Sequence, residues 1–378
     1  MGRLEKNILR ARSLEIIRAG QAESGAYVAC PSYPTYQYSW FRDGAFIASA
    51  ADAWGDHLGA ARFYCWATGL IAARAEAVER CLQAAARGAR PELSDLLHTR
   101  YGLDGQPGSE DWPNFQLDGF GTLLWGIEHH LSKRADFQRG VVLSAWTPAI
   151  RLLVRYLAAL WREPNYDCWE EFPNRVAVST LAAVHAGLRA ASTLLGAADH
   201  DGALASRTAD QIREWVLARG THDSHLIKQI AGADVVDASL LWASTPFGEH
   251  GLLSPRDPLM LGTARRIERD LVAGDGGVYR YRADTYYGGG EWVLLTALLG
   301  QYYARAGEDA GAARCLAVVE RQADPHGQLP EQWSTAALAP SYIQEWTARW
   351  GPVATPLLWS HAEYLRLCAA LRERLPTD

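Results

Sequence analysis

Apolar residues recur every three or four positions along most of this chain, the spacing of helices with one buried face. Between residues 142 and 161, Ile150, Leu153 and Leu157 follow this spacing, and Pro148 is expected near the helix start, where proline is tolerated. The same periodicity recurs in residues 175–196, 203–219 and 354–374. Strand-like alternation is scarce, so the sequence predicts an all-α fold of about a dozen helices.

Polar, aromatic and glycine residues collect in six segments, each between two predicted helices. These are residues 33–46, 108–121, 165–174, 234–242, 279–292 and 327–333. About 50 to 75 residues separate successive segments, which is enough for two helices and their turns. No Pro/Gly/Ser-rich linker divides the chain. The spacing predicts a single domain over residues 1–378. We expect an (α/α)6 barrel of six inner and six outer helices, with the active site at the mouth formed by these inter-helix loops.

The charge balance argues against a polyanionic partner. Lys and Arg number 37 against 43 Asp and Glu, a net charge of −6 without long runs of either sign, so we expect neither nucleic-acid nor membrane binding. The six cysteines form no C-x-x-C pair, and the N-terminus lacks a secretory signal, so a cytoplasmic protein with reduced thiols is expected. The 15 Trp and 16 Tyr against 8 Phe suggest either carbohydrate-binding surfaces or a Trp-rich helical core.

Glu170 is the clearest candidate for a general acid. Its neighbours Asp167, Trp169 and Glu171 would raise its pKa through burial and repulsion, which would keep the carboxyl protonated near neutral pH. A helix beginning at about Phe172 would have the opposite effect, because its positive end would stabilise the carboxylate. Acidic residues in a first helical turn are also common without any catalytic role.

Glu331 is the candidate for the second carboxylate. Pro330 restricts its backbone and Trp333 can exclude solvent, so the group could be held rigidly at the mouth of the barrel. Taken alone, the motif is more typical of a helix-capping carboxylate than of a catalytic one. A pair of such carboxylates on separate loops is what hydrolysis of a glycoside requires.

Two further segments carry groups suited to a sugar. Trp40 can pack on the apolar face of a pyranose ring while Arg42 and Asp43 bind adjacent hydroxyls; the alternative is an intrahelical ion pair beside a core Trp. Residues 280–287 offer similar groups and are followed by three glycines, with a flexible turn as the alternative. The histidines show no metal-ligand spacing, and His361 reads as a core residue, so neither a metal nor a cofactor is expected.

Taken together, these motifs resemble glycoside hydrolase family 15, the glucoamylase and glucodextranase family, over nearly the whole chain. The matching motifs are Tyr36-x-x-x-Trp40-x-Arg42-Asp43, Pro113-Asn114-Phe115-Gln116-Leu117-Asp118-Gly119, Asp167-Cys168-Trp169-Glu170-Glu171, Arg280-Tyr281-x-x-Asp284-Thr285-Tyr286-Tyr287-x-Gly289-x-x-Trp292, Glu331-Gln332 and Leu358-Trp359-Ser360-His361-Ala362. The resemblance implies an (α/α)6 barrel in which Glu170 is the general acid, Glu331 is the general base and Tyr36 helps to place the attacking water. It implies substrate binding by Trp40, Arg42, Asp43, Trp112, Asp118, Trp169, Glu171, Arg280, Asp284 and Trp292.

Substrate preference rests on the resemblance alone. Residues 108–119 are most similar to those of single-domain bacterial members that act on isomaltose, and no β-sandwich or starch-binding domain is expected. The resemblance therefore implies an inverting, exo-acting hydrolase that releases β-glucose from the non-reducing end of short α-1,6-linked glucosides such as isomaltose. A trehalase, a glucoamylase acting on α-1,4 bonds and a non-catalytic sugar-binding barrel remain alternatives.

Overall fold

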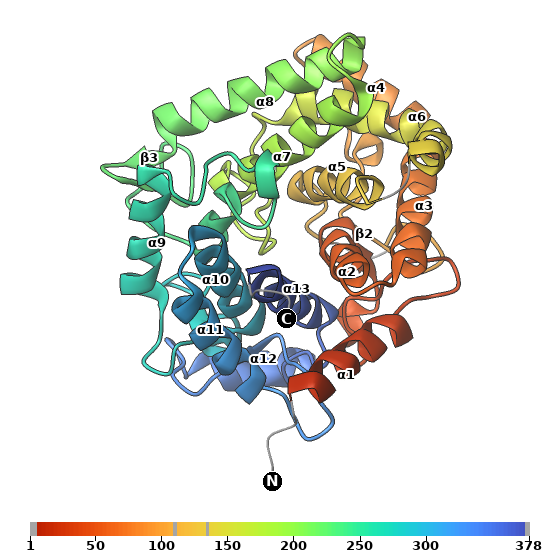
Figure 1. The fold of residues 1–378 in the computed structure, drawn as a ribbon. Coiled ribbons are helices and arrows are strands. Elements are labelled where there is room, and N and C mark those ends of the chain that lie inside the picture. Colours follow the sequence, from red (N-terminus) through yellow and green to blue (C-terminus); the bar gives the residue numbers. More distant parts are fainter. Residues whose placement is uncertain (1–5, 109–111, 134–135, 375–378) are drawn as a thin grey trace.

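The helices form two concentric layers in the computed structural model, which describes residues 6–108, 112–133 and 136–374 (Figure 1). The inner elements contact one another in chain order and the last contacts the first, so that they close a ring. They are α2 (Phe41–Ala53), α5 (Asp118–Leu131), α7 (Val178–Leu195), η3 (Ala238–Ala243), α10 (Val293–Ala306) and α13 (Leu358–Arg374). The fourth of them, η3, is a 3₁₀ segment, whereas the sequence predicted an α-helix in every inner position.

Each inner element is covered by one outer helix. Helix α1 packs on α13, α3 on α2, α6 on α5, α8 on α7, α9 on η3 and α11 on α10. The outer helices are α1 (Lys6–Ala19), α3 (His57–Ala73), α6 (Asp136–Leu160), α8 (His200–Arg219), α9 (Pro258–Leu271) and α11 (Asp309–Arg321). Within the part of the chain that the structure describes, two helices lie outside this pairing, α4 (Ala75–Ala86) and α12 (Tyr342–Trp350). Because of α4, the first interval between polar segments holds three helices where two were predicted. The prediction of a mostly helical fold is confirmed.

Short strands tie the polar segments together. Strand β1 pairs with β2, β3 with β4, and β6 pairs with both β5 and β7, all antiparallel. The strands are β1 (Ser39–Trp40), β2 (Arg100–Tyr101), β3 (Thr221–His222), β4 (His225–Leu226), β5 (Val278–Tyr279), β6 (Glu291–Trp292) and β7 (Gln332–Trp333). The remaining 3₁₀ turns are η1 (Pro34–Tyr36), η2 (Leu93–Asp95), η4 (Gly248–His250) and η5 (Tyr286–Gly288). Because β1 and β6 run directly into α2 and α10, they hold segments distant in the chain at the end where inner helices begin.

Two predicted helix starts are wrong. Pro148 lies inside α6, because the helix extends back to Asp136; a proline removes one hydrogen bond, which a long packed helix tolerates. No helix begins at Phe172. Glu170 and Phe172 have φ values of 66° and 54°, which are incompatible with a right-handed helix, and α7 starts only at Val178.

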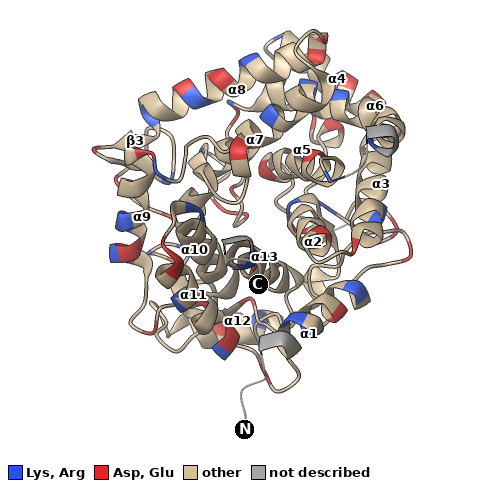
Figure 2. Ribbon diagram, viewed as in Figure 1, with Lys and Arg blue, Asp and Glu red and all other residues tan. Residues whose placement is uncertain are grey.

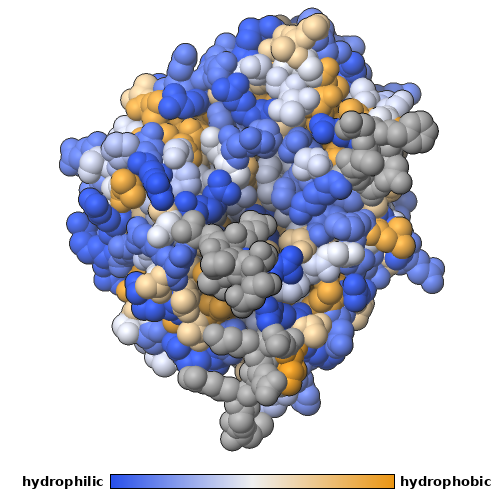
Figure 3. Space-filling view, in the orientation of Figure 1, coloured by the Kyte–Doolittle hydropathy of each residue, from blue (hydrophilic) through white to orange (hydrophobic). Residues whose placement is uncertain are grey.

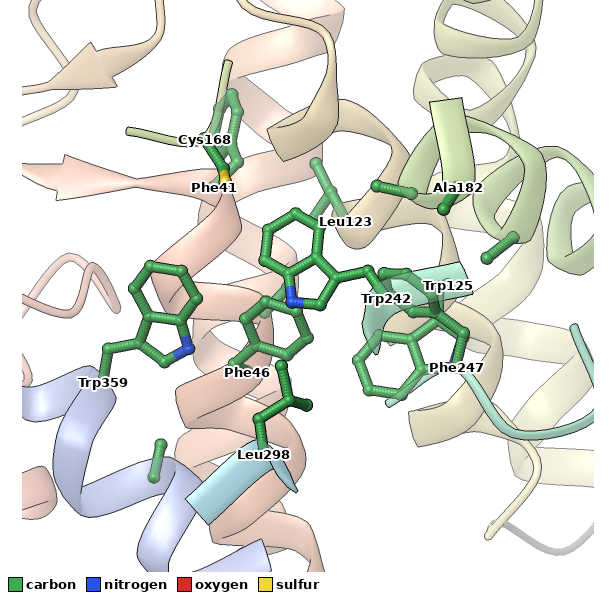
Figure 4. Packing of buried hydrophobic residues seen from close by; sticks show 14 of the residues in the cluster. Phe41, Phe46, Leu123, Trp125, Cys168, Ala182, Trp242, Phe247, Leu298 and Trp359 are labelled. Carbon is green, nitrogen blue, oxygen red and sulfur yellow. The ribbon is translucent and has the colours of Figure 1, made fainter. Parts of the chain in front are cut away.

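Five large aromatic side chains fill the centre of the inner ring (Figure 4). Phe46 stacks on Trp359, with ring centroids 5.5 Å apart and an interplanar angle of 8°. Trp125, Trp242 and Phe247 surround Phe46 on its other sides at centroid distances of 5.7 to 6.2 Å. Tryptophan therefore fills the core, as one interpretation of the composition predicted, and the site described below shows that it also lines a cavity.

The surface carries both charge signs. Figure 2 shows basic and acidic residues interspersed along the outer helices, and Figure 3 shows a mainly hydrophilic face on which hydrophobic residues are scattered. By length and composition alone, Arg139–Leu160 of α6 could span a membrane; 44% of its most apolar window is buried inside the fold. In this segment Arg151 pairs with Asp199 and Asp201, and α6 packs on α3, α5 and α8, so its apolar face is a contact surface between helices.

Candidate active site

A cavity of about 670 Å³ lies beside the first residues of α2, α10 and α13. Most of the residues singled out from the sequence line it, although they come from segments far apart in the chain. These are Tyr36, Trp40, Arg42, Asp43, Trp112, Trp169, Glu170, Glu171, Arg280, Trp292 and Glu331. The structure therefore brings both candidate acids and the candidate sugar clamp to one cavity. The neighbouring residues Ser109, Glu110 and Asp111 of the 108–119 motif lie outside the described residues.

Asp118 and Asp284 do not line the cavity, in contrast to their expected role in substrate binding. Both are at most 1% exposed and lie behind an arginine. Asp118 accepts a hydrogen bond from Arg42 at 3.1 Å, and Asp284 accepts one from Arg280 at 2.7 Å. A carboxylate in this place neutralises the guanidinium and fixes its orientation.

The backbone around Glu170 forms a tight turn. Asp167 accepts hydrogen bonds from the amides of Trp169 and Glu171 on one carboxylate oxygen, both at 3.0 Å, and its backbone carbonyl accepts one from the amide of Glu170. Glu170 and Phe172 both adopt left-handed φ values, which cost free energy in residues other than glycine. The turn aims the Glu170 side chain into the cavity, and the helix end expected to oppose a raised pKa is absent.

The Glu170 carboxyl is largely buried, with 16% of its side chain exposed. Burial raises its pKa; Arg42, whose Nη2 lies 4.0 Å away, and a 2.7 Å hydrogen bond donated by Trp40 Nε1 act against this rise. The raised pKa agrees with the sequence prediction, but the main cause is burial. Asp167, expected to repel Glu170, is instead engaged with backbone amides and with Lys228 Nζ at 3.5 Å.

Glu331 occupies a more enclosed place, with 3% of the residue exposed. The Tyr36 hydroxyl donates to its Oε1 at 3.1 Å, whereas its Oε2 has no hydrogen-bond partner in the protein. Burial raises the pKa of Glu331 to about 8, despite opposing effects of Arg280 and Tyr36. Tyr286, which the sequence analysis quoted within a motif but assigned no role, shares a 3.0 Å hydrogen bond with the Tyr36 hydroxyl. Glu331 therefore has one oxygen held by the protein and one available to a ligand or to water.

Arg42 and Asp43, the sugar clamp predicted from the sequence, lie next to each other in the wall of the cavity. Arg42 Nη1 donates to Gln116 Oε1 at 3.0 Å as well as to Asp118, and Arg42 Nε lies 3.3 Å from Asp43 Oδ2. Arg42 Nε and Asp43 Oδ2 face each other as this ion pair, and neither makes a further hydrogen bond within the protein. The intrahelical ion pair considered as the alternative is present, but it is part of the cavity wall.

A second arginine, Arg280, also lines the cavity. Arg280 donates to Glu171 Oε1 at 3.3 Å, and the Tyr281 hydroxyl donates to Glu171 Oε2 at 2.5 Å. The Arg280 guanidinium lies 5.3 Å from the ring centroid of Trp169 and 5.1 Å from that of Trp292, so the charge is sandwiched between aromatic walls. These contacts fix the orientation of Glu171 and both tryptophans toward the cavity.

Helix α12 forms a further wall of the cavity that the sequence motifs did not predict. Trp346, Arg349 and Trp350 line the cavity from this helix. Trp346 packs edge-on against Tyr286, at a centroid distance of 4.9 Å. The signal was present as two tryptophans four residues apart on one helix face, a spacing that predicts neighbouring side chains. Without a partner motif nearby, this pattern looked like an ordinary surface helix.

One group among the described residues has the donor set of a metal site. The donor atoms of His222, His225 and Asp234 lie within 4.8 Å of one another, beside the β3–β4 hairpin and outside the cavity. Arg266 Nη1 lies 3.1 Å from Asp234 Oδ2, and this neighbouring positive charge disfavours a divalent cation. His361 is fully buried and satisfied by Ser13 and the Leu329 amide, which confirms it as a core histidine.

Comparisons with known proteins agree with this geometry. The profile of glycosyl hydrolases family 15 matches residues 5–349. The chain is 42% identical over 365 residues to isomaltose glucohydrolase of Kribbella flavida, an alignment that covers 96% of this chain and 92% of the relative. A solved wild-type glycosidase superposes with a TM-score of 0.91 at 40% identity, covering 98% of this chain and 99% of the other. A variant solved in complex with glucose superposes equally well.

A more distant structure has the same fold. A bacterial glucoamylase complexed with acarbose superposes with a TM-score of 0.75 at 21% identity; the match covers 97% of this chain and 56% of the glucoamylase chain. The helical ring described here is therefore also found in the glucoamylase.

Proposed function

The chain belongs to glycoside hydrolase family 15, and on that premise we propose that it hydrolyses the α-1,6 bond of isomaltose and releases β-glucose from the non-reducing end. The premise makes it a glycoside hydrolase; the linkage, the substrate length and the stereochemistry are the proposal. The 42% identity to an isomaltose glucohydrolase over nearly the full length of both chains supports this choice of substrate.

The observation that carries the proposal is the pair of buried glutamates in one cavity. Glu170 and Glu331 come from segments about 160 residues apart, yet both line the same 670 Å³ space and both have raised pKa values. No hydrogen bond joins the two carboxyl groups. An inverting reaction requires a separation of about 6.5 to 9.5 Å so that water can attack from the face opposite the leaving group.

The two glutamates are assigned different roles by their surroundings. Glu170, which accepts a hydrogen bond from Trp40, protonates the glycosidic oxygen; this role follows from its position in the family motif, and burial raises its pKa so that a proton is held there. Glu331 removes a proton from the attacking water through Oε2, which has no partner in the protein, and Tyr36 holds the other oxygen. In a single displacement, the bond from the anomeric carbon to water forms as the bond to the leaving oxygen breaks, so the released glucose is the β anomer.

The terminal glucose would be held by the clamp of Arg42 and Asp43, with Trp40 and Trp112 as apolar walls. Glu171 and Arg280 would contact the leaving sugar on the other side, where Trp169 and Trp292 frame them. Asp118 and Asp284 would act through the arginines that they hold.

We further infer that the closed ring is an (α/α)6 barrel and that it forms one catalytic domain. Six inner elements, each covered by one outer helix, support this arrangement, with the 3₁₀ segment η3 taking one inner position. The likeness to the glucoamylase fold supports it as well.

The test of the proposal compares isomaltose, maltose and trehalose as substrates while proton NMR follows the anomer released. We expect kcat/KM for isomaltose to exceed that for the other two by at least about tenfold, because linkage geometry decides whether the leaving sugar reaches Glu171 and Arg280. The first signal to grow should be β-glucose. Preferential turnover of maltose or trehalose would transfer the assignment to the glucoamylase or trehalase alternative, and initial α-glucose would exclude inversion.

The pH dependence tests the environment of Glu331. The active form requires a protonated Glu170 and an ionised Glu331, so a plot of kcat/KM against pH should be bell-shaped, with a limb near pH 8 set by Glu331. Tyr36→Phe removes a hydrogen bond that stabilises the carboxylate, so the pKa of Glu331 rises and this limb moves to higher pH by about one unit. Tyr286→Phe should shift it less, in the same direction. An unchanged limb in Tyr36→Phe would show that Tyr36 does not tune Glu331.

A further inference from the structure

Lys228 is a buried cation outside the catalytic cavity. It follows strand β4, is 6% exposed and does not line the cavity. Its backbone is fixed by two hydrogen bonds: its amide donates to the carbonyl of Val235 at 2.7 Å, and its carbonyl accepts from the amide of Val178, the first residue of α7, at 3.0 Å. The side chain therefore extends from a rigid part of the backbone.

Two buried carboxylates compensate the charge of Lys228. Nζ donates to Asp237 Oδ2 at 2.6 Å and lies 3.5 Å from Asp167 Oδ2. Both aspartates are at most 3% exposed. Burial lowers the pKa of Lys228, but Asp237 and Asp167 raise it by more, so the net shift is upward and the side chain remains charged. The ammonium group is therefore a fixed positive charge between two acids.

The contact with Asp167 leads to the turn that carries Glu170. Asp167 Oδ2 faces the ammonium, and Oδ1 accepts from the amides of Trp169 and Glu171, both at 3.0 Å. Because Glu170 holds a left-handed φ of 66°, the turn depends on such bonds to keep its shape. Burial raises the pKa of Asp167 to about 6, and Lys228 opposes this rise. The ammonium therefore helps to keep this carboxylate ionised, in the form that accepts most strongly from the amides of the turn.

Two further contacts of Lys228 lead to the neighbours of the general acid. Asp237 Oδ2, which accepts from Lys228, also accepts from Trp169 Nε1 at 2.9 Å. Nζ lies 3.7 Å from the ring centroid of Tyr281, whose hydroxyl donates to Glu171 Oε2 at 2.5 Å. Lys228 thus reaches three consecutive residues of the cavity wall, each through one intermediate residue.

We propose that Lys228 is a positioning residue for the general acid of the hydrolysis. It does not reach the cavity, and it acts through Asp167 on the turn that aims Glu170. Asp237 and Tyr281 extend this hold to the two flanking side chains. The proposal rests on the assignment of Glu170 as the acid. A misplacement of about 1 Å at a reacting group can cost about a hundredfold in rate, so loss of the ammonium should act on the chemical step.

Two substrates with different leaving groups separate this role from a merely structural one. Release of a sugar requires a proton from the general acid, whereas the fluoride of α-glucosyl fluoride leaves without one. Lys228→Met keeps the length of the side chain and removes its charge. We expect kcat on isomaltose to fall at least about tenfold and kcat on α-glucosyl fluoride to fall less than about threefold. An equal loss on both substrates, or no loss on isomaltose, would overturn the proposal.

Two variants and the wild-type protein serve as references. Glu170→Gln should show the same contrast between the substrates, and Lys133→Met, at an exposed position after α5, should leave both rates unchanged. If Glu170→Gln lost both rates equally, the acid would be wrongly assigned and the role of Lys228 would fall with it. If wild-type protein hydrolyses maltose or trehalose in preference to isomaltose, only the proposed substrate is wrong, and the comparison with α-glucosyl fluoride is made on the preferred disaccharide.

A second variant covers the case in which circular dichroism shows that Lys228→Met does not fold. Asp167→Asn removes the same ion pair and leaves an amide oxygen to accept from the turn. A loss of roughly threefold or more that is confined to the disaccharide supports the positioning role. Unchanged rates, or equal losses on both substrates, in whichever variant folds overturn it.

Discussion

Glu170→Gln and Glu331→Gln are each expected to lower kcat on isomaltose by about a thousandfold, the usual contribution of a positioned acid or base. Glutamine keeps the size of the side chain but can neither protonate the leaving oxygen nor accept a proton from water. Steady-state kinetics on isomaltose measures the loss. A fall of less than tenfold in either variant would show that the wrong residue has been assigned.

Neither substitution is expected to destabilise the fold. Burial raises the pKa of both carboxyls, which means that the ionised form is less stable in the folded chain than in the unfolded chain. As the pH rises through the raised pKa, the buried carboxyl ionises and the folded protein loses stability. A neutral glutamine avoids this loss. Thermal unfolding at pH 7 should show an equal or higher Tm for both variants. The matched control Glu214→Gln, at an exposed position of α8, should change neither kcat nor Tm.

Gly121→Ala is expected to have the largest effect on stability, a loss of about 3 kcal/mol from overpacking. Helices α5 and α7 approach each other closely at Gly121 and Gly187. A Cβ at position 121 would overlap the carbonyl of Ala183 and lie 2.7 Å from the amide nitrogen of Val184. Both obstacles are backbone atoms, so a rotamer change cannot relieve the clash, and the inner ring must open. Urea or thermal unfolding measures the loss.

Gly69→Ala is the control, and it is expected to change the stability in the opposite direction. Gly69 lies on an exposed turn of α3, and a Cβ there meets nothing within 4 Å. Because alanine favours the helix over glycine, this variant should be more stable by up to about 1 kcal/mol. If both substitutions changed the free energy of unfolding equally, close packing of α5 on α7 would not be the reason that position 121 requires glycine.

The helices and the order of the functional segments could be predicted because both are local properties of the sequence. The apolar spacing in residues 175–196 predicted a buried helix face, and Leu181, Val184 and Leu188 of this segment are fully buried in α7. The wrong predictions concerned the local conformation of the backbone. Glu170 and Phe172 take left-handed backbone conformations that propensity does not predict, and η3 occupies a place where an α-helix was expected.

The sequence by itself determined the helical class of this protein and the identity of the groups able to do acid–base chemistry, because periodicity and side-chain chemistry act over a few residues. Tertiary structure alone decided which of these groups share a cavity. It placed Asp118 and Asp284 behind arginines and added the tryptophans of α12 to the wall. Such relations join residues remote in the chain, and they arise only when closure of the ring buries side chains together and excludes water from around them.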